Sequence, residues 1–303
     1  MMDNTRPKIF AKSVWNRDQA RLKLIAGCDG IEYQILNPDY DPLMKDDWWD
    51  DRLAANAVSI HMPLISYRDG MRKYEDDSGL ETPAGIKYLP IVCERAEKIA
   101  EFRGIPIHVV IHIEEEVHKL KLLGLWDQTV LFMRDIADRY QNLIFSVENV
   151  IALLRQPLTH VDFVEEVNRP NVGTCLDTCH AMMTAERTRM LSQCGIKPVS
   201  FETFFYRNKD VCNWLHLNNA KNLGDGFGME KGHGAPFDME DEQDMKRLRN
   251  IIKFYRKYDY NCPFCIEIRE DSYTETPVNY ISTKMSLESI LGMDECYDTA
   301  TDF

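Results

Sequence analysis

Short apolar runs and longer segments of mixed polarity alternate along the whole chain. Several of the short runs carry almost no polar position, as in His108–Ile113, which is typical of parallel strands that are buried on both faces. We expect eight strands, which are Ile9–Trp15, Gly30–Leu36, Ala57–Pro63, His108–Ile113, Leu143–Asn149, Val172–Thr178, Cys212–Asn218 and Pro263–Arg269.

The segments between these strands carry apolar residues at helical spacing. The pattern is clearest in Ile86–Arg103, where Leu89, Val92 and Ala96 fall on one face. The other predicted helices are Arg17–Ile25, Lys45–Ala55, Asp127–Tyr140, Thr159–Asn168, Phe201–Asp210, Asp241–Tyr258 and Val278–Leu291. Eight strand–helix alternations predict an α/β fold, a (β/α)8 barrel that forms one domain over residues 1–303. A doubly wound sheet is disfavoured because no Gly-x-Gly-x-x-Gly motif follows the first strand.

The loops after the second and third predicted strands are long. Chemistry in a (β/α)8 barrel lies at the carboxyl ends of the strands and in the loops that follow, so both loops can cover a small substrate. Trp48 and Trp49 lie in the first of them, and we expect this pair to pack on the barrel. The acidic tail, residues 294–303, is expected to fray.

Composition narrows the class of protein. A chain of 303 residues with 44% hydrophobic positions is long enough for a large core. No apolar segment approaches the roughly 20 residues of a membrane helix, and the N-terminus lacks the apolar region of a signal peptide. Nine scattered cysteines suit a reduced compartment, so we expect a cytoplasmic protein. The net charge of −13 argues against a broad nucleic-acid surface, while a local basic groove and a homo-oligomer stay open.

Six of the apolar runs end in a histidine or carboxylate residue that can bind a metal ion. These residues are His61, His112, Glu148, Asp177, His216 and Glu267. If the strands form one barrel, the six side chains converge at one rim, and such an arrangement binds a divalent metal. The last four offer three carboxylates and one imidazole, which suit Mn²⁺, Co²⁺, Zn²⁺ or Mg²⁺ better than a structural zinc site, where thiolates are preferred. His180 follows Asp177 by three residues and can face the same cavity.

Seven short motifs contain these residues and span most of the chain. They are His61-Met62-Pro63, Val110-Ile111-His112, Val147-Glu148-Asn149, Leu176-Asp177-Thr178-Cys179-His180, His216-Leu217-Asn218-Asn219-Ala220-Lys221, Gly232-His233-Gly234 and Ile266-Glu267. In wording and order they resemble the xylose isomerase-like TIM-barrel superfamily, which includes endonuclease IV and many sugar isomerases and epimerases. The Asp-Thr-Cys-His and His-Leu-Asn-x-Ala-Lys motifs closely resemble the corresponding motifs of endonuclease IV.

The resemblance implies a ligand set. One shared metal would be held by Glu148, Asp177, His216 and Glu267. In the nuclease branch, His61 and His112 would hold a second metal, with Glu148 bridging the two. A third nuclease metal needs His180 and an Asp-x-His sequence after His216.

Residues 225–231 contain no Asp-x-His sequence, which argues against the trinuclear site and so against cleavage of a DNA backbone. His233 is a candidate to substitute for the missing Asp-x-His sequence. Otherwise His180 is free to contact the substrate, as the resemblance to sugar epimerases implies.

We therefore expect first a divalent-metal-dependent isomerase or epimerase of a small sugar or polyol, acting through an enediolate. Glu148 and Glu267, on non-adjacent strands, would remove and return the proton next to the carbonyl, and His180 would stabilise the developing oxyanion. The alternatives are an endonuclease IV-like abasic-site endonuclease or phosphodiesterase, a dinuclear hydrolase, and a barrel that binds a ligand without turnover.

Two further signals are less specific. Lys221 and Arg269 lie at the predicted rim and, with His180 and His233, are candidates for substrate contacts, although the two cations can equally pair with acidic ligands. The spacing of Cys262 and Cys265 is that of a redox pair. Such a motif normally opens a helix, whereas this one runs into a strand, so we interpret it as structural.

Overall fold

Eight parallel strands close into a barrel in the order β1-β12-β9-β8-β7-β6-β3-β2. Their bounds are β1 (Ile9–Ser13), β2 (Ile31–Gln34), β3 (Ala57–His61), β6 (Ile107–His112), β7 (Leu143–Glu148), β8 (Val172–Asp177), β9 (Cys212–Leu217) and β12 (Phe264–Ile266). The computed structural model describes residues 6–63, 65–68, 71–77, 79–113, 117–150, 158–221, 233–270 and 274–297. All eight predicted strands are present, and the predicted (β/α)8 TIM-barrel fold is confirmed.

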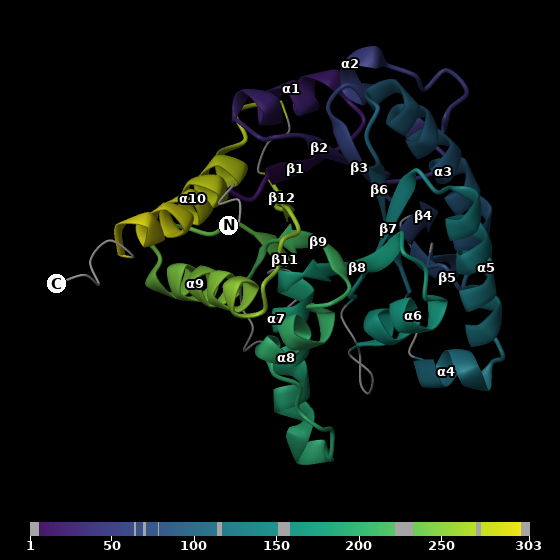
Figure 1. Cartoon of the computed structure of the whole chain (residues 1–303). Helices are drawn as coiled ribbons and strands as arrows, with labels where there is room; N and C mark the ends of the chain where they lie inside the picture. The colour runs from purple at the N-terminus through teal and green to yellow at the C-terminus, as the bar shows by residue number, and fades with distance from the viewer. Residues whose placement is uncertain are drawn as a thin grey trace.

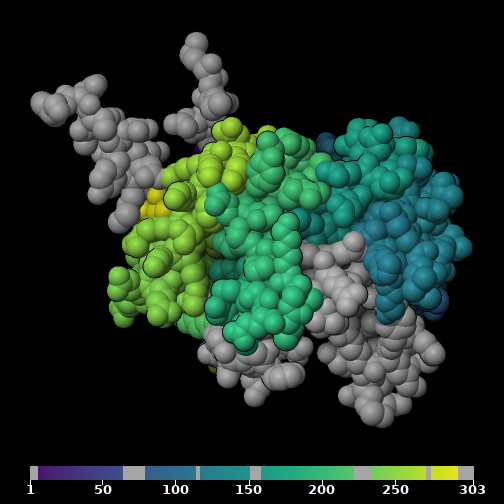
Figure 2. Space-filling view, turned by 90° about the horizontal axis from the view of Figure 1, so that it is seen from below, coloured from purple at the N-terminus to yellow at the C-terminus, as the bar shows by residue number. Residues whose placement is uncertain are grey.

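Helices surround this ring of strands (Figure 1). Their bounds are α1 (Arg17–Ile25), α2 (Asp51–Ala54), α3 (Pro83–Arg103), α4 (Val117–Leu122), α5 (Trp126–Arg139), α6 (Thr159–Val167), α7 (Thr178–Met190), α8 (Phe201–Asn208), α9 (Glu242–Lys257) and α10 (Val278–Tyr297). In the view from below, the green region of α7 and α8 lies between yellow-green segments that include α9 and blue segments that include α4 and α5 (Figure 2). No helix among the described residues has the length and apolar character needed to cross a membrane.

Smaller elements lie outside the barrel. The long loop after β3 forms an antiparallel pair, β4 (Ile65–Arg68) with β5 (Met71–Asp77). A second antiparallel pair, β10 (Asn219–Ala220) with β11 (His233–Ala235), follows β9. Single turns of 3-10 helix occupy η1 (Pro42–Met44) and η2 (Leu191–Cys194). None of these elements was predicted, nor were helices α4 and α7.

The helix predicted over Lys45–Ala55 is wrong in most of its length, because only Asp51–Ala54 is helical. The Asp50 carboxylate accepts hydrogen bonds from the backbone N–H groups of Arg52 and Leu53 and so starts the helix there. The Trp48 carbonyl, which a longer helix would pair with Arg52, instead accepts a hydrogen bond of 3.0 Å from Trp15 Nε1.

The two tryptophans of this loop pack as predicted. Trp48 is buried against Trp15, with ring centroids 5.7 Å apart. Trp49 meets Phe102 of α3 edge to face and carries the Lys98 ammonium 4.2 Å from its ring centroid. At the other end of the chain, α10 continues to Tyr297, so the tail predicted to fray is helical over its first residues. Residues 298–303 lie outside the described residues.

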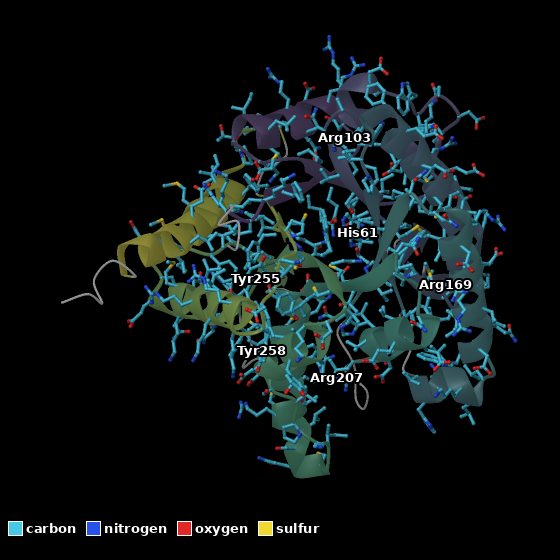
Figure 3. The ribbon with its side chains drawn as sticks, in the orientation of Figure 1. His61, Arg103, Arg169, Arg207, Tyr255 and Tyr258 are labelled. Atoms are coloured by element: carbon cyan, nitrogen blue, oxygen red, sulfur yellow. The ribbon has the colours of Figure 1, made fainter. Side chains whose placement is uncertain are left out.

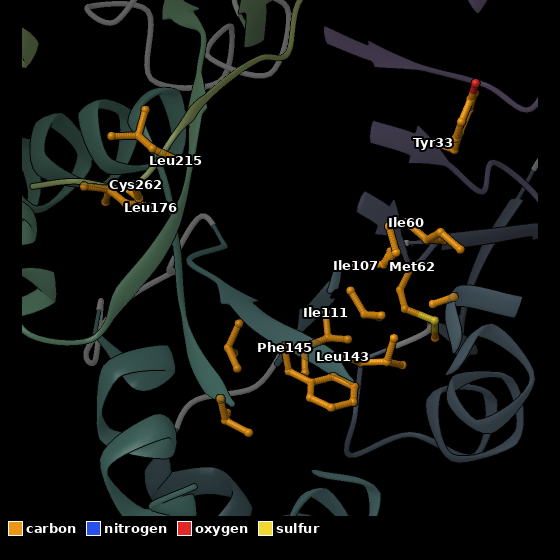
Figure 4. Packing of buried hydrophobic residues seen from close by; sticks show 14 of the residues in the cluster. Tyr33, Ile60, Met62, Ile107, Ile111, Leu143, Phe145, Leu176, Leu215 and Cys262 are labelled. Carbon is orange, nitrogen blue, oxygen red and sulfur yellow. The ribbon is translucent and has the colours of Figure 1, made fainter. Parts of the chain in front are cut away.

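Alternate residues of the strands face two different environments. Ile107, Ile111, Leu143 and Phe145 belong to the large core between strands and helices, and they group beside β6 and β7 in Figure 4. The intervening residues face the barrel interior, where one layer is a separate buried cluster of Phe10, Val58, Val110, Cys175, Trp214 and Cys265. Both faces of each strand are therefore buried, which explains the continuous apolar runs in the sequence.

The cysteines of the Cys-x-x-Cys sequence do not face each other. Cys265 fills the interior layer, whereas Cys262 Sγ lies 3.9 Å from Cys212 Sγ. The two residues therefore occupy different parts of the core, in agreement with the structural interpretation of this motif.

Gly173 in β8 lies so close to neighbouring groups that there is no room for a side chain. A methyl group added there would lie 2.5 Å from the Val211 carbonyl oxygen and 2.5 Å from Asn213 Nδ2. Because a backbone carbonyl cannot move as a flexible side chain can, we expect Gly173→Ala to lower the free energy of unfolding by about 1–3 kcal/mol in urea denaturation. Gly292→Ala, where the added methyl group meets nothing within 4 Å, is the control and should leave stability unchanged or slightly raised. An equal effect of the two substitutions would contradict the close packing at Gly173.

Candidate metal centre

Each of the eight barrel strands brings one ionisable side chain to the same region of the interior. In chain order these are Lys12, Glu32, His61, His112, Glu148, Asp177, His216 and Glu267, the last directly after β12. Most have no exposed surface, and Glu267 is the most open, with 17% of its side chain exposed. Figure 3 shows His61 within the ring of strands, while Arg169 and Arg207 lie among the outer helices.

Glu148 joins the histidines of three strands. Its Oε2 lies 3.1 Å from His61 Nε2 and 2.6 Å from His112 Nε2. Its Oε1 lies 3.0 Å from His216 Nδ1. Burial opposes the ionised form of Glu148, but the neighbouring His216, His112 and His61 outweigh it and hold the pKa of this carboxyl well below its usual value. Glu148 is therefore an anionic carboxylate with a different partner on each oxygen.

His216 contacts carboxylates through both ring nitrogens. Nδ1 lies 2.9 Å from Glu267 Oε2, in addition to its contact with Glu148. Nε2 lies 2.9 Å from Glu32 Oε1 on the other side of the ring. Burial lowers the pKa of His216, but the surrounding negative charges outweigh burial and raise it well above its usual value. The four atoms that His61, Glu148, His216 and Glu267 can offer to a metal lie within 4.8 Å of one another.

Asp177 is fixed by three groups around it. It caps α7 by accepting a hydrogen bond of 2.6 Å from the His180 backbone N–H through Oδ1. Oδ2 accepts one of 2.9 Å from Asn218 Nδ2, and the Asn149 amide contacts the Asp177 backbone. Burial and the nearby charge of Glu148 raise the pKa of Asp177 to about 6. The helix cap therefore sets the direction of this predicted ligand.

His180 lies beside the same group of side chains. Its Nδ1 lies 2.7 Å from the Asn149 carbonyl oxygen, and 3.8 Å from Glu148 Oε1. Burial alone would lower the pKa of this imidazole, but the charges of Asp177, Glu148 and Glu267 outweigh it and raise the pKa above its usual value. Glu148, Asp177 and His180 form a second group whose ligand atoms lie within 4.8 Å of one another.

The donor set fits a divalent cation. Four carboxylates (Glu32, Glu148, Asp177 and Glu267) share one small region of low solvent exposure with a single lysine. Apart from its contact with His216, the buried Oε2 of Glu267 has no hydrogen-bond partner among the described residues. Because uncompensated buried carboxylates are very costly, a bound cation with oxygen and imidazole ligands would relieve the excess negative charge.

The structure brings the six predicted ligands together with His180, whereas Lys221 and Arg269 make other contacts. Lys221 Nζ lies 3.2 Å from Asp244 Oδ2, so this ammonium pairs with α9 and not with the ligand carboxylates. Arg269 is exposed, and its backbone N–H donates to the Gly234 carbonyl of β11. The His233 backbone lies in β11, but its side chain is outside the described residues, as are residues 222–232. Contacts from these residues to a substrate stay predictions.

Lys12 and Glu32 were not predicted as site residues. Both lie inside short strands, at positions 12 in Ile9–Ser13 and 32 in Ile31–Gln34, whereas the predicted ligands close their strands. The available signal was a single charged residue with apolar neighbours in each strand. Such a residue is costly to bury unless it is paired, and so it indicates a partner in the interior.

The chain also matches known proteins. A family model described as xylose isomerase-like TIM barrel matches residues 25–289. An L-ribulose 3-epimerase structure aligns over 96% of this chain and 98% of its own, with 14% identity and a TM-score of 0.62. A D-psicose 3-epimerase from Clostridium cellulolyticum H10 aligns over 95% and 98%, with 14% identity and a TM-score of 0.56.

A third solved structure, a 3-keto-D-glucoside 4-epimerase from E. coli, aligns over 94% of this chain and 100% of its own, with 12% identity and a TM-score of 0.53. No curated protein matches the chain significantly in sequence. At these identities the structural likeness shows a common fold.

Proposed function

The chain belongs to the xylose isomerase-like TIM-barrel family, and from this premise we propose that it is a divalent-metal-dependent isomerase or epimerase of a small sugar or related polyol. The observation that carries the proposal is the approach of two carboxylates, Glu148 and Glu267, to the same imidazole nitrogen. Glu148 Oε1 and Glu267 Oε2 lie 3.0 Å and 2.9 Å from His216 Nδ1. The epimerases among the similar structures support the substrate class.

The metal would be held by Glu148, Asp177, His216 and Glu267. When bound, it would act as a Lewis acid on a carbonyl and the adjacent hydroxyl oxygen of the substrate. These ligands fit Mn²⁺, Co²⁺, Zn²⁺ or Mg²⁺, all of which accept oxygen and imidazole donors.

Proton transfer falls to two of the chain's carboxylates. Glu148 comes from β7 and Glu267 follows β12, and two other strands, β8 and β9, separate these in the barrel. One carboxylate takes the proton from the carbon next to the carbonyl, and the other returns a proton from the opposite side. Glu267 has the most exposed side chain of the group, so the substrate enters beside it.

His180 is assigned to the oxygen on which negative charge develops. Its Nδ1 lies 2.7 Å from the Asn149 carbonyl oxygen, and we assign Nε2, the second ring nitrogen, as the donor to a substrate oxygen. The helix N-terminus at Asp177 holds the backbone of His180 in place through the bond to Asp177 Oδ1. A donor fixed in this way stabilises the oxyanion without reorganising during the reaction.

The test combines metal content with isotope exchange. The protein is purified without an affinity metal, and its metal is determined by elemental analysis beside a Glu148→Ala control. A panel of ketoses is then incubated with it in D₂O. We expect one or two metals per chain, fewer in the control, and deuterium entering the sugar next to its carbonyl. Absence of metal even after reconstitution would overturn the proposal and leave a barrel that binds a ligand without turnover.

A second function is favoured by one observation. His61 and His112 both lie close to Glu148 Oε2, at 3.1 Å and 2.6 Å, so these three residues would hold a second cation. This arrangement suits a phosphodiesterase or abasic-site endonuclease, although the net charge of −13 opposes a nucleic-acid substrate. About three zinc ions per chain and cleavage of an abasic-site duplex would favour this function over the isomerase.

A further inference from the structure

Glu32 lies on the side of His216 that faces away from the predicted metal ligands. Its Oε1 is 2.9 Å from His216 Nε2, and both side chains are fully buried. The opposite nitrogen of the same ring, Nδ1, faces Glu148 and Glu267. The imidazole is therefore held between a carboxylate outside the ligand group and the two carboxylates inside it.

The contact has a consequence for the proton on His216. A neutral imidazole carries one N–H, and the nitrogen that binds a metal must offer a lone pair. A carboxylate beside Nε2 favours the form in which Nε2 carries the proton, and this leaves Nδ1 as the ligand atom. Carboxylates that hold metal-binding histidines in this way orient the ring and increase its basicity.

Lys12 explains how a fully buried carboxylate can lie at this position. Its ammonium is 3.8 Å from Glu32 Oε1 and 2.7 Å from Glu267 Oε1, and Lys12 and Glu32 are register partners on β1 and β2. Apart from the contacts of Oε1 with Lys12 and His216, neither Glu32 oxygen has a hydrogen-bond partner among the described residues. The lysine thus compensates the charge of Glu32 while the carboxylate remains directed at His216.

A second metal bound to Glu32 itself is the competing possibility. Glu32, His216 and Cys265 place three potential ligand atoms within 4.8 Å of one another. However, the Lys12 ammonium already occupies the cationic position beside Glu32. The geometry favours a carboxylate that orients His216.

We infer that Glu32 is a positioning residue of the metal centre, which holds the Nε2 side of His216 so that Nδ1 faces Glu148 and Glu267. The inference rests on the proposed function, since it requires a metal on His216. Glu32 itself touches neither the metal nor the substrate. Its loss therefore acts through the histidine and weakens metal binding without removing a ligand.

The test titrates metal-free protein with Mn²⁺ by calorimetry. Glu32→Gln keeps the shape and one acceptor oxygen, and Glu32→Leu removes both acceptor and charge. We expect Mn²⁺ affinity to fall about 10-fold in the first variant and about 100-fold in the second. Glu270→Gln is the matched control, because Glu270 is also a buried carboxylate paired with a lysine, at 2.7 Å from Lys23, but contacts no ligand; its affinity should not change.

The outcomes separate the inference from the proposed function. Wild-type protein that binds Mn²⁺ while both Glu32 variants bind it equally well would overturn the inference alone. An equal loss in the glutamine and leucine variants would also overturn it, because charge and not orientation would then be responsible. Wild-type protein that binds no divalent metal would overturn the proposed function together with the inference. Far-UV circular dichroism confirms that each variant is folded, and Glu32→Gln suffices where the leucine variant fails to fold.

Discussion

Glu148→Gln is expected to lower turnover by about 10²- to 10⁴-fold, the usual contribution of a positioned acid or base. Turnover is measured on the responsive sugar, which is the ketose of the panel that takes up deuterium with the wild-type protein. The substitution keeps the side-chain shape but removes the charge that His61, His112 and His216 surround. It also weakens one metal ligand, so kcat and metal content are measured on the same preparations. Loss of turnover at full metal occupancy would isolate the role in proton transfer.

Glu267→Gln should show a complementary defect. If the two carboxylates serve opposite sides of the substrate, each substitution stops deuterium exchange from one epimer more than from the other. The measurement is deuterium uptake from D₂O, starting separately from each epimer of the responsive sugar. Glu270→Gln, a buried carboxylate outside the centre, should retain full turnover and full exchange. Full turnover in either site variant would show that the acid and base have been assigned to the wrong residues.

The barrel could be predicted from the sequence because its strands are buried on both faces. Parallel strands covered by helices on one side and by the packed interior on the other must be apolar on both faces, and this produced runs such as His108–Ile113. The strand-end residues of the candidate metal centre were also recognisable, since packing alone rarely places an imidazole or carboxylate at the end of an apolar run. His112 and Glu148 are register partners on β6 and β7, as are Asp177 and His216 on β8 and β9.

Two features could not be predicted from the sequence. They are the part of the site formed by Glu32 and Lys12, and the start of helix α7. Whether a charged residue inside a strand points to the interior depends on register and on barrel closure. The sequence therefore could not identify the partners that lie 2.9 Å from Glu32 and 2.7 Å from Lys12. Helix α7 begins at Thr178, directly after Asp177, which ends β8 and caps the helix, so no intervening loop marks its start. Its first turns are buried, so the usual contrast between apolar and polar faces is lost.

Trp214 is the largest side chain of the interior layer that lies next to the candidate metal centre. Trp214 is 1% exposed and lies two residues before His216 on β9, with its side chain on the same face of the strand. Its ring stacks on Phe10 of β1 at 5.3 Å between centroids, and lies 4.3 Å from the His108 ring of β6. The indole therefore connects β9 with β1 and β6 across the barrel interior.

Trp214→Ala should lower the free energy of unfolding by about 3–5 kcal/mol, because a closed barrel cannot collapse around the cavity that the indole leaves. Urea unfolding followed by far-UV circular dichroism measures this, since the substitution itself alters tryptophan fluorescence. Trp49→Ala, on the partly exposed outer surface against Lys98 and Phe102, is the matched control and should cost much less. If the alanine variant does not fold, Trp214→Phe should show a smaller loss in the same direction. A loss at Trp214 no larger than that at Trp49 would mean that the interior layer does not support the strands, and the metal centre would then have to be held in place by the helices and loops alone.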